Sequence, residues 1–403
     1  MASDPRRGPF DRLRPAAIVA AAYLVLVFVW VVAGRQLPGG RWLAVHLFTL
    51  GVLTNLILAL SDHFARTLTR QPGEAPSAQL FVVNAGATAV FIGVATGRPW
   101  WVAVGATVIS AVVVASYRRL RRLRRTALAP RFGWIVRMYE RAHGAFLHGA
   151  LLGALVGTGV LGGPWVGAVR TAHLHVNVLG WAGVTLLATI VFFGPTIART
   201  RIREGADVRA ARALRLGVYG LGIGVLSLVG TGFGGGPGGV ARVIATVGLT
   251  VFAWSVTVVC VPVIRSAFRS TAPERWSVLA VAAWFVPVAW SDAFLVGAGA
   301  WRLLESVGAG MLLGVLAQSI VAAGGYIAPR LLHLDPATAL PRTEAFGAVR
   351  AAAWNLGTLL VVGAAAAPAT SPIGSVGWAL VLLVVVARVF LVVRAVSHDG
   401  RSA

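Results

Sequence analysis

The sequence contains no lysine and a single cysteine, and only 13 of its 403 residues are acidic. With Cys260 alone, intramolecular disulfides and thiolate metal clusters are excluded. The sequence also lacks a nucleophile elbow, a P-loop and a metalloprotease helix motif, which argues against hydrolase and kinase activity. If the chain is an enzyme, it is therefore a redox enzyme.

Hydrophobic residues dominate the composition. They make up 57% of the chain, charged residues only 12%, and the mean hydropathy is +0.79. Apolar segments near the roughly 20 residues that span a bilayer recur along the whole length, and no stretch between them is long enough for a soluble domain. The sequence thus predicts an all-α integral membrane protein with about twelve transmembrane helices, forming one polytopic domain over residues 1–403.

The positive charge is distributed in a pattern. All 36 basic residues are arginine, the net charge is +23, and every second loop between apolar segments is basic. This fits the positive-inside rule for a multi-pass protein of the plasma or inner cell membrane with both termini in the cytoplasm. The basic patches have no soluble domain, so we expect contact with the lipid bilayer and none with nucleic acid.

One short pattern occurs three times, with a polar side chain five residues before a glycine. It spans His46–Gly51, His175–Gly180 and Glu305–Gly310, with offsets of 129 and 130 residues. Each copy opens a long apolar segment. We therefore expect three four-helix repeats at approximately 15–120, 140–265 and 275–396.

Ionisable side chains at membrane depth are unfavourable unless paired or hydrated, so each is a candidate for function. The candidates near the outer ends of the predicted spans are His46, His173, His175, Asp292 and Glu305. A second group, towards the cytoplasmic side, comprises His63, His143 and His148.

The outer group has the chemistry of a metal site. Neutral imidazole suits copper, zinc or haem iron, while Glu305 and Asp292 have carboxylates able to bind metal or to accept the hydrogen bond that orients a ligating ring. His173 and His175 are about 200° apart on a regular helix, so both bind one metal only if residues 171–173 are not helical. We favour His175 as the ligand that joins His46.

Each candidate also has a structural explanation. The outer histidines are equally explained as interfacial residues bonded to loop carbonyls. His63 and His143 suit the headgroup interface, and His148 suits a buried position bonded to a neighbouring carbonyl.

Local motifs suggest a family. These are Arg41–His46 continuing to Asp62–Arg66, Ala172–Trp181 continuing to Gly194–Thr196, and Gln318 followed by Gly325–Pro329. With about twelve helices in three arcs, the chain resembles the catalytic subunit of haem-copper oxidases. It is also similar to their NnrS-type relatives and to the membrane region of some multicopper oxidase and copper nitrite reductase-like proteins.

The resemblance implies a haem-copper-oxidase-like bundle in which His46 takes the haem-type position and His175, or His173, the copper-type position. The implied cofactor is haem b or copper. The seventh span, at about Leu214–Gly234, has no histidine, and the tenth has Glu305 where the family has histidines. A complete oxygen-reducing centre is therefore not expected, and the chain either binds one haem or copper or has lost the cofactor.

Three functions remain open. The first is a haem- or copper-binding protein that handles copper, nitrogen oxides or electrons beside a copper-containing redox protein. The second is a secondary transporter or permease, although carriers usually repeat in two halves rather than three units. The third is a membrane anchor or assembly partner of a copper enzyme.

Overall fold

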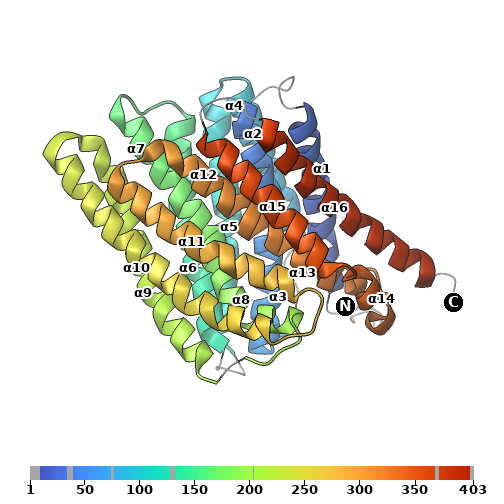
Figure 1. Ribbon diagram of the computed structural model, residues 1–403. Coiled ribbons are helices and arrows are strands. Elements are labelled where there is room, and N and C mark those ends of the chain that lie inside the picture. The colour runs from blue at the N-terminus through green and yellow to red at the C-terminus, as the bar shows by residue number, and fades with distance from the viewer. Residues whose placement is uncertain are drawn as a thin grey trace. The chain divides into compact units, whose positions relative to one another are not determined.

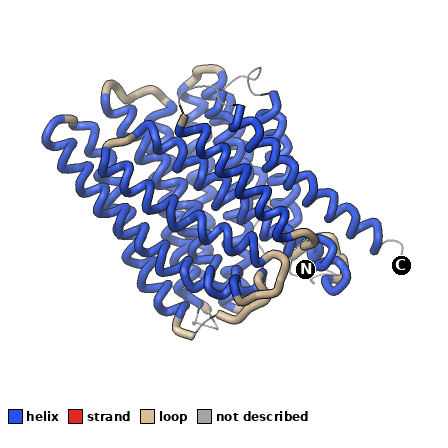
Figure 2. Tube along the Cα trace, in the orientation of Figure 1, coloured by secondary structure: helices blue, strands red, loops and turns tan. Residues whose placement is uncertain are grey.

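The computed structural model describes residues 10–33, 40–73, 77–127, 132–202, 204–367 and 372–399. Every regular element within these ranges is a helix (Figure 2). Eleven of the helices are long and apolar enough to cross a membrane. This confirms the predicted class, an all-α multi-pass membrane protein.

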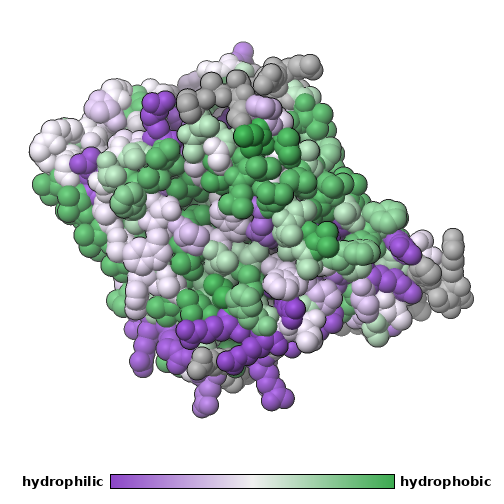
Figure 3. Space-filling view, viewed as in Figure 1, coloured by the Kyte–Doolittle hydropathy of each residue, from purple (hydrophilic) through white to green (hydrophobic). Residues whose placement is uncertain are grey.

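Helices are suited to a lipid environment because of their backbone hydrogen bonds. In the hydrocarbon layer every backbone N–H and C=O must be bonded internally, and a helix achieves this within one segment. Their outer faces carry apolar side chains; Phe81, Leu226 and Phe294, for example, are each more than 70% exposed. Apolar residues also cover much of the face seen in Figure 3. These side chains suit contact with lipid.

The chain divides into two compact units, described separately. The first unit comprises residues 1–185 and 225–242. Its helices are η1 (Asp11–Leu13), α1 (Arg14–Ala33), α2 (Gly40–His46), η2 (Leu47–Leu53), α3 (Thr54–Thr69), α4 (Ala78–Ala95), α5 (Pro99–Arg125), α6 (Gly133–Gly157), α7 (Pro164–His175), η4 (Val176–Gly183) and η5 (Thr231–Phe233).

The second unit comprises residues 186–224 and 243–403. Its helices are α8 (Val184–Ile197), α9 (Ala206–Gly230), α10 (Gly235–Phe268), α11 (Arg275–Ala298), η6 (Trp301–Leu303), α12 (Leu304–Ala309), η7 (Gly310–Ala317), α13 (Gln318–Leu331), α14 (Pro336–Thr343), α15 (Gly347–Ala366) and α16 (Pro372–Asp399). Because α8, α9 and α10 cross the division, these three helices belong partly to the first unit.

The described residues contain eleven apolar helices of membrane-spanning length, whereas the sequence predicts about twelve spans. The fifth expected span falls in α6. It is 25 residues long, but its first half contains Arg137, Glu140 and Arg141. It is therefore not among the eleven. Glu140 is neutralised by Arg124, whose Nε and Nη2 donate to its two carboxylate oxygens at 2.5 and 3.1 Å.

Three of the long helices contain a π-helical segment, namely η2, η4 and η7. Each segment has Leu-Gly at its fourth and fifth positions. Nearby side chains donate to backbone carbonyls of these segments: Asn55 to Gly51 in η2, at 2.6 Å, and Trp354 to Leu313 in η7, at 3.1 Å. Such segments are rare and often occur at functional sites.

Glycines bring neighbouring helices into backbone contact at three places. The pairs are Gly86 with Gly105 (α4 and α5), Gly220 with Gly248 (α9 and α10), and Gly357 with Gly377 (α15 and α16). In each pair, a Cβ on either glycine would press against the carbonyl oxygen of the other. Helices α15 and α16 run side by side in Figure 1. Small residues thus permit the close packing that membrane helices use.

Candidate functional site

The first unit brings His46 and His173 together. His46 ends α2 and His173 lies near the end of α7, yet their ring centroids are 6.4 Å apart and their ring planes differ by only 12°. Both side chains are partly buried. Two of the histidines singled out from the sequence therefore form a pair.

The His46 ring is held by Trp42, one turn earlier in α2. Its Nδ1 lies 2.9 Å from the Trp42 carbonyl oxygen, and the Trp42 ring stacks on it with a centroid distance of 4.2 Å. A carbonyl only accepts, so Nδ1 carries the proton and Nε2 has a free lone pair. This is the tautomer in which an imidazole binds a metal through Nε2.

The His173 ring is held by α6. Its Nδ1 lies 2.8 Å from the Gly149 carbonyl oxygen and 3.2 Å from Nδ2 of Asn177. The carbonyl only accepts and is the nearer partner, so we assign the proton to Nδ1 and the lone pair to Nε2. Asn177, one turn later, donates from Nδ2 to the His173 carbonyl at 2.9 Å. Among the described residues, no hydrogen-bond partner lies at Nε2 of His46 or of His173.

Two glycines of α6 make room for this arrangement. A Cβ on Gly153 would lie 2.6 Å from Cε1 of His173, and a Cβ on Gly149 would overlap the Asn177 amide. The Gly149–Gly153 spacing thus matches the four-residue spacing of His173 and Asn177 on the facing helix. The small-residue run of α6 is visible in the sequence, but the sequence does not show which side chains pack against these glycines.

His175 points elsewhere. Residues 171–173 are helical, which places the His173 and His175 side chains on different faces of α7. The His175 ring is buried, and its Nδ1 bonds to the Thr171 carbonyl at 2.8 Å. The structure therefore pairs His46 with His173 rather than with the favoured His175.

The second group of candidate histidines, His63, His143 and His148, occupies three separate environments in the first unit. His63 contacts the rings of Phe10 and Phe64. His143 is fully buried, with Nδ1 on the Tyr139 carbonyl at 2.7 Å and Nε2 3.0 Å from the Ser116 hydroxyl. His148 is exposed and bonds to the carbonyl one turn earlier. Each of the three has a local structural explanation.

Asp292 and Glu305 belong to the second unit. Asp292 is buried in α11, and Glu305 lies in the first turn of α12. Among the described residues, no three His, Cys, Asp or Glu side chains come together as a closed metal site requires. Among the described residues, His46 and His173 thus form a pair that no third side chain of these types joins.

The third occurrence of the sequence pattern lies in a different register relative to its π segment. The π segments begin directly after His46, His175 and Ala309, so Ala309–Gly314 occupies the place of His46–Gly51. Glu305 lies four residues earlier. The third copy thus has an apolar residue where the first two have histidine.

Trp42, Gly149 and Asn177 contribute to the site without having been identified from the sequence as its components. Trp42 was available as an aromatic residue four positions before a candidate histidine. The roles of Gly149 and Asn177 depend on contacts between helices. No family model and no curated protein matches the sequence.

Proposed function

We propose that the chain is a membrane metalloprotein related to the haem-copper oxidases, in which Nε2 of His46 and Nε2 of His173 bind haem iron or copper. The observation that carries the proposal is this histidine pair, with both Nδ1 atoms committed to backbone carbonyls. The arrangement fixes both tautomers and ring orientations in the way that ligating histidines require.

Two imidazoles fit a restricted set of centres. His46 and His173 could hold a haem iron or a single copper ion, each through its Nε2. Metal–nitrogen distances of about 2.0 Å place two such ring centroids about 6 Å apart. The observed 6.4 Å is compatible with that separation. A bound haem or copper would supply one-electron redox chemistry, while His46 and His173 hold and orient it.

Several observations support three related four-helix units, with α6 as the twelfth span. The π segments and the reciprocal glycine contacts each occur three times. Asn84 and Asn355 both lie two residues before the contact glycine, while Asn55 and Gln318 each lie four residues after the glycine of the Leu-Gly pair in η2 and η7. With Ala309 in the place that His46 and His175 occupy before the other two π segments, this arrangement fits a relative with an incomplete oxygen-reducing centre.

The test is a reduced-minus-oxidised visible spectrum and a metal analysis of the detergent-purified protein. His46→Gln and His173→Gln should each lose the haem band or the bound copper. His148→Gln is the matched control, since its ring bonds only within its own helix, and it should retain them. Colourless, metal-free protein after growth with haem and copper would refute the proposal and favour a transporter or an anchor.

A further inference from the structure

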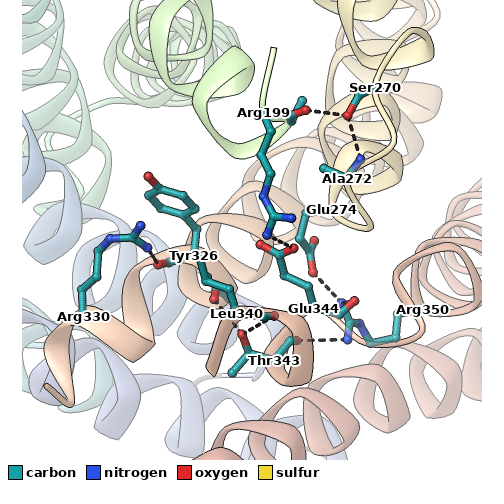
Figure 4. A network of polar contacts seen from close by, with 12 residues as sticks. Arg199, Ser270, Ala272, Glu274, Tyr326, Arg330, Leu340, Thr343, Glu344 and Arg350 are labelled. Carbon is teal, nitrogen blue, oxygen red and sulfur yellow. Dashed lines mark hydrogen bonds and ion pairs between the residues drawn. The ribbon is translucent and has the colours of Figure 1, made fainter. Parts of the chain in front are cut away.

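The second unit contains a cluster of charged side chains, most of them buried (Figure 4). It joins Glu274 before α11, Glu344 after α14, Arg350 of α15 and Arg388 of α16, all less than 10% exposed, with the half-exposed Arg199 at the end of α8. Charges are rarely buried unless they are paired. The two carboxylates of this cluster differ in how completely they are paired.

Glu274 is fully partnered. Its Oε1 accepts from Nη2 of Arg350 and from Nη2 of Arg388, each at 2.5 Å, and its Oε2 accepts from the Ser277 hydroxyl at 2.9 Å. Nη1 of Arg388 donates to the Thr343 carbonyl at 2.5 Å. A carboxylate bonded in this way to two guanidinium groups and a hydroxyl has a structural role.

Glu344 is only half partnered. Its Oε2 accepts from Nη2 of Arg199 at 2.7 Å, whereas Oε1 has no hydrogen-bond partner among the described residues. The Glu344 side chain is 0% exposed, but that of Arg199 is 47% exposed. The buried carboxyl group is thus bonded to a side chain that itself reaches water, and one of its two oxygens lacks a donor among the described residues.

A buried carboxylate oxygen without a hydrogen-bond donor favours the protonated form of the carboxyl group. A buried anionic oxygen without a donor is costly, and the cost falls when the group becomes neutral. Burial raises the pKa of the Glu344 carboxyl above its ordinary value. The positive charges of Arg199 and Arg388 lower this pKa and the Glu274 carboxylate raises it, but burial has the largest effect and the net shift is upward. Glu344 is therefore able to take up a proton without leaving its site.

Charged groups from several helices surround the Glu344 carboxyl. Arg199 lies two residues after α8, Glu274 directly before α11, Arg350 in α15 and Arg388 in α16. On α13, the guanidinium of Arg330 instead lies 3.9 Å over the ring of Tyr326 and donates to that residue's carbonyl. On α14, Arg342 donates to the Thr338 carbonyl of its own helix.

We propose that Glu344 is a proton-binding site, which exchanges its proton with water past the Arg199 side chain. Uptake transfers a proton from hydronium to the Glu344 carboxylate and leaves water. The net charge of the five side chains rises from +1 to +2, and Arg199 loses its ionic partner. No oxidation is involved, and the site uses none of the residues assigned to the metal, so either proposal can fail alone.

Infrared spectroscopy of the purified full-length protein, titrated between pH about 4 and about 9, tests this directly. We expect a protonated-carboxyl stretching band that disappears as the pH rises and is lost in Glu344→Gln. Glu140→Gln is the matched control, because both oxygens of that buried glutamate are bonded to Arg124. It should leave the band unchanged.

A second variant tests the route and remains informative if Glu344→Gln fails to fold. Removing the neighbouring cation in Arg199→Gln should move the midpoint of the band to higher pH, because the ionised form loses its partner. Arg342→Gln, which removes a cation bonded to its own helix, should leave the midpoint in place. No Glu344-dependent band, or a midpoint unaffected by Arg199→Gln, would overturn the proposal.

Discussion

At the scale of single residues, the histidine pair depends on atoms that are not histidine. The carbonyls of Trp42 and Gly149 set both tautomers, and the absence of a Cβ at Gly149 leaves space for Asn177. The orientation of a ligating histidine depends on the groups that hydrogen-bond to its ring. The site is therefore sensitive to substitutions that leave both imidazoles intact.

Gly149→Ala should destabilise the protein by about 1–3 kcal/mol, because the new methyl overlaps the Asn177 amide in a packed helix contact. Reversible unfolding in mixed micelles measures the change. The control is Gly144→Ala on the same helix, where a Cβ would meet nothing within 4 Å. That variant should be neutral or more stable by up to about 1 kcal/mol. Equal effects would contradict the packing explanation.

Glu274→Gln should be among the most damaging single substitutions, at about 3–5 kcal/mol, because it leaves the buried guanidinium groups of Arg350 and Arg388 without their anion. The same unfolding assay applies. Glu204→Gln, at an exposed position of the second unit, should stay within about 0.5 kcal/mol of the wild type. A mild effect at Glu274 would mean that the arginines find other partners.

The contribution of Glu344 to the free energy of unfolding should depend on pH with the opposite sign to that of an ordinary salt-bridged carboxylate. Its pKa is raised in the folded protein, so the folded state binds more protons than the unfolded state above pH about 4.3. The stability it contributes is present below that pH and is lost as the pH rises through the folded pKa. Unfolding measured across this interval should show the decline in the wild type, and Glu344→Gln should flatten it.

At the scale of helices, the sequence was sufficient for the class of fold. Lipid forces long apolar helices, and hydropathy records that requirement directly. The pairing of His46 with His173 was not readable in the same way, because facing side chains depend on how α2, α6 and α7 pack. The π segments add to the difficulty, since helical periodicity of 3.6 residues per turn does not carry through η2 or η4.

The buried charge cluster escaped prediction for a different reason. Glu274 and Glu344 lie at the ends of helices, where acidic residues are expected to be solvated. Their partners, Arg350 and Arg199, lie 76 and 145 residues away in the sequence. No local pattern records contacts of that range, so only packing reveals that both glutamates are buried.

The glycine contacts between helices lead to a prediction at this scale. In Gly248→Ala the new Cβ would overlap the backbone of Gly220 and Gly224, which cannot rotate away as a side chain does. We expect α9 and α10 to separate locally, with a loss of about 1–3 kcal/mol in the unfolding assay. Gly222→Ala, on the same helix pair with open space around its Cβ, should show no such loss.

At the scale of the whole molecule, charge determines orientation. Helix α5 has 27 residues, a length of about 40 Å against a hydrocarbon layer of about 30 Å. Its last turns carry Arg118, Arg121, Arg122 and Arg125, all exposed, while Arg119 and Arg124 pair with Asp62 and Glu140. From the positive-inside rule, we expect these exposed arginines to lie at the headgroups of the cytoplasmic leaflet.

Labelling of introduced cysteines tests this orientation, because the native Cys260 is buried and should remain unlabelled. A membrane-impermeant maleimide should label Val160→Cys, between α6 and α7, in intact cells. It should label Thr271→Cys, between α10 and α11, only after permeabilisation. The reverse pattern would place the basic loops outside. Because Thr271 lies beside Ser270, which bonds to Ala198 next to Arg199, the same result identifies the side from which Glu344 exchanges its proton.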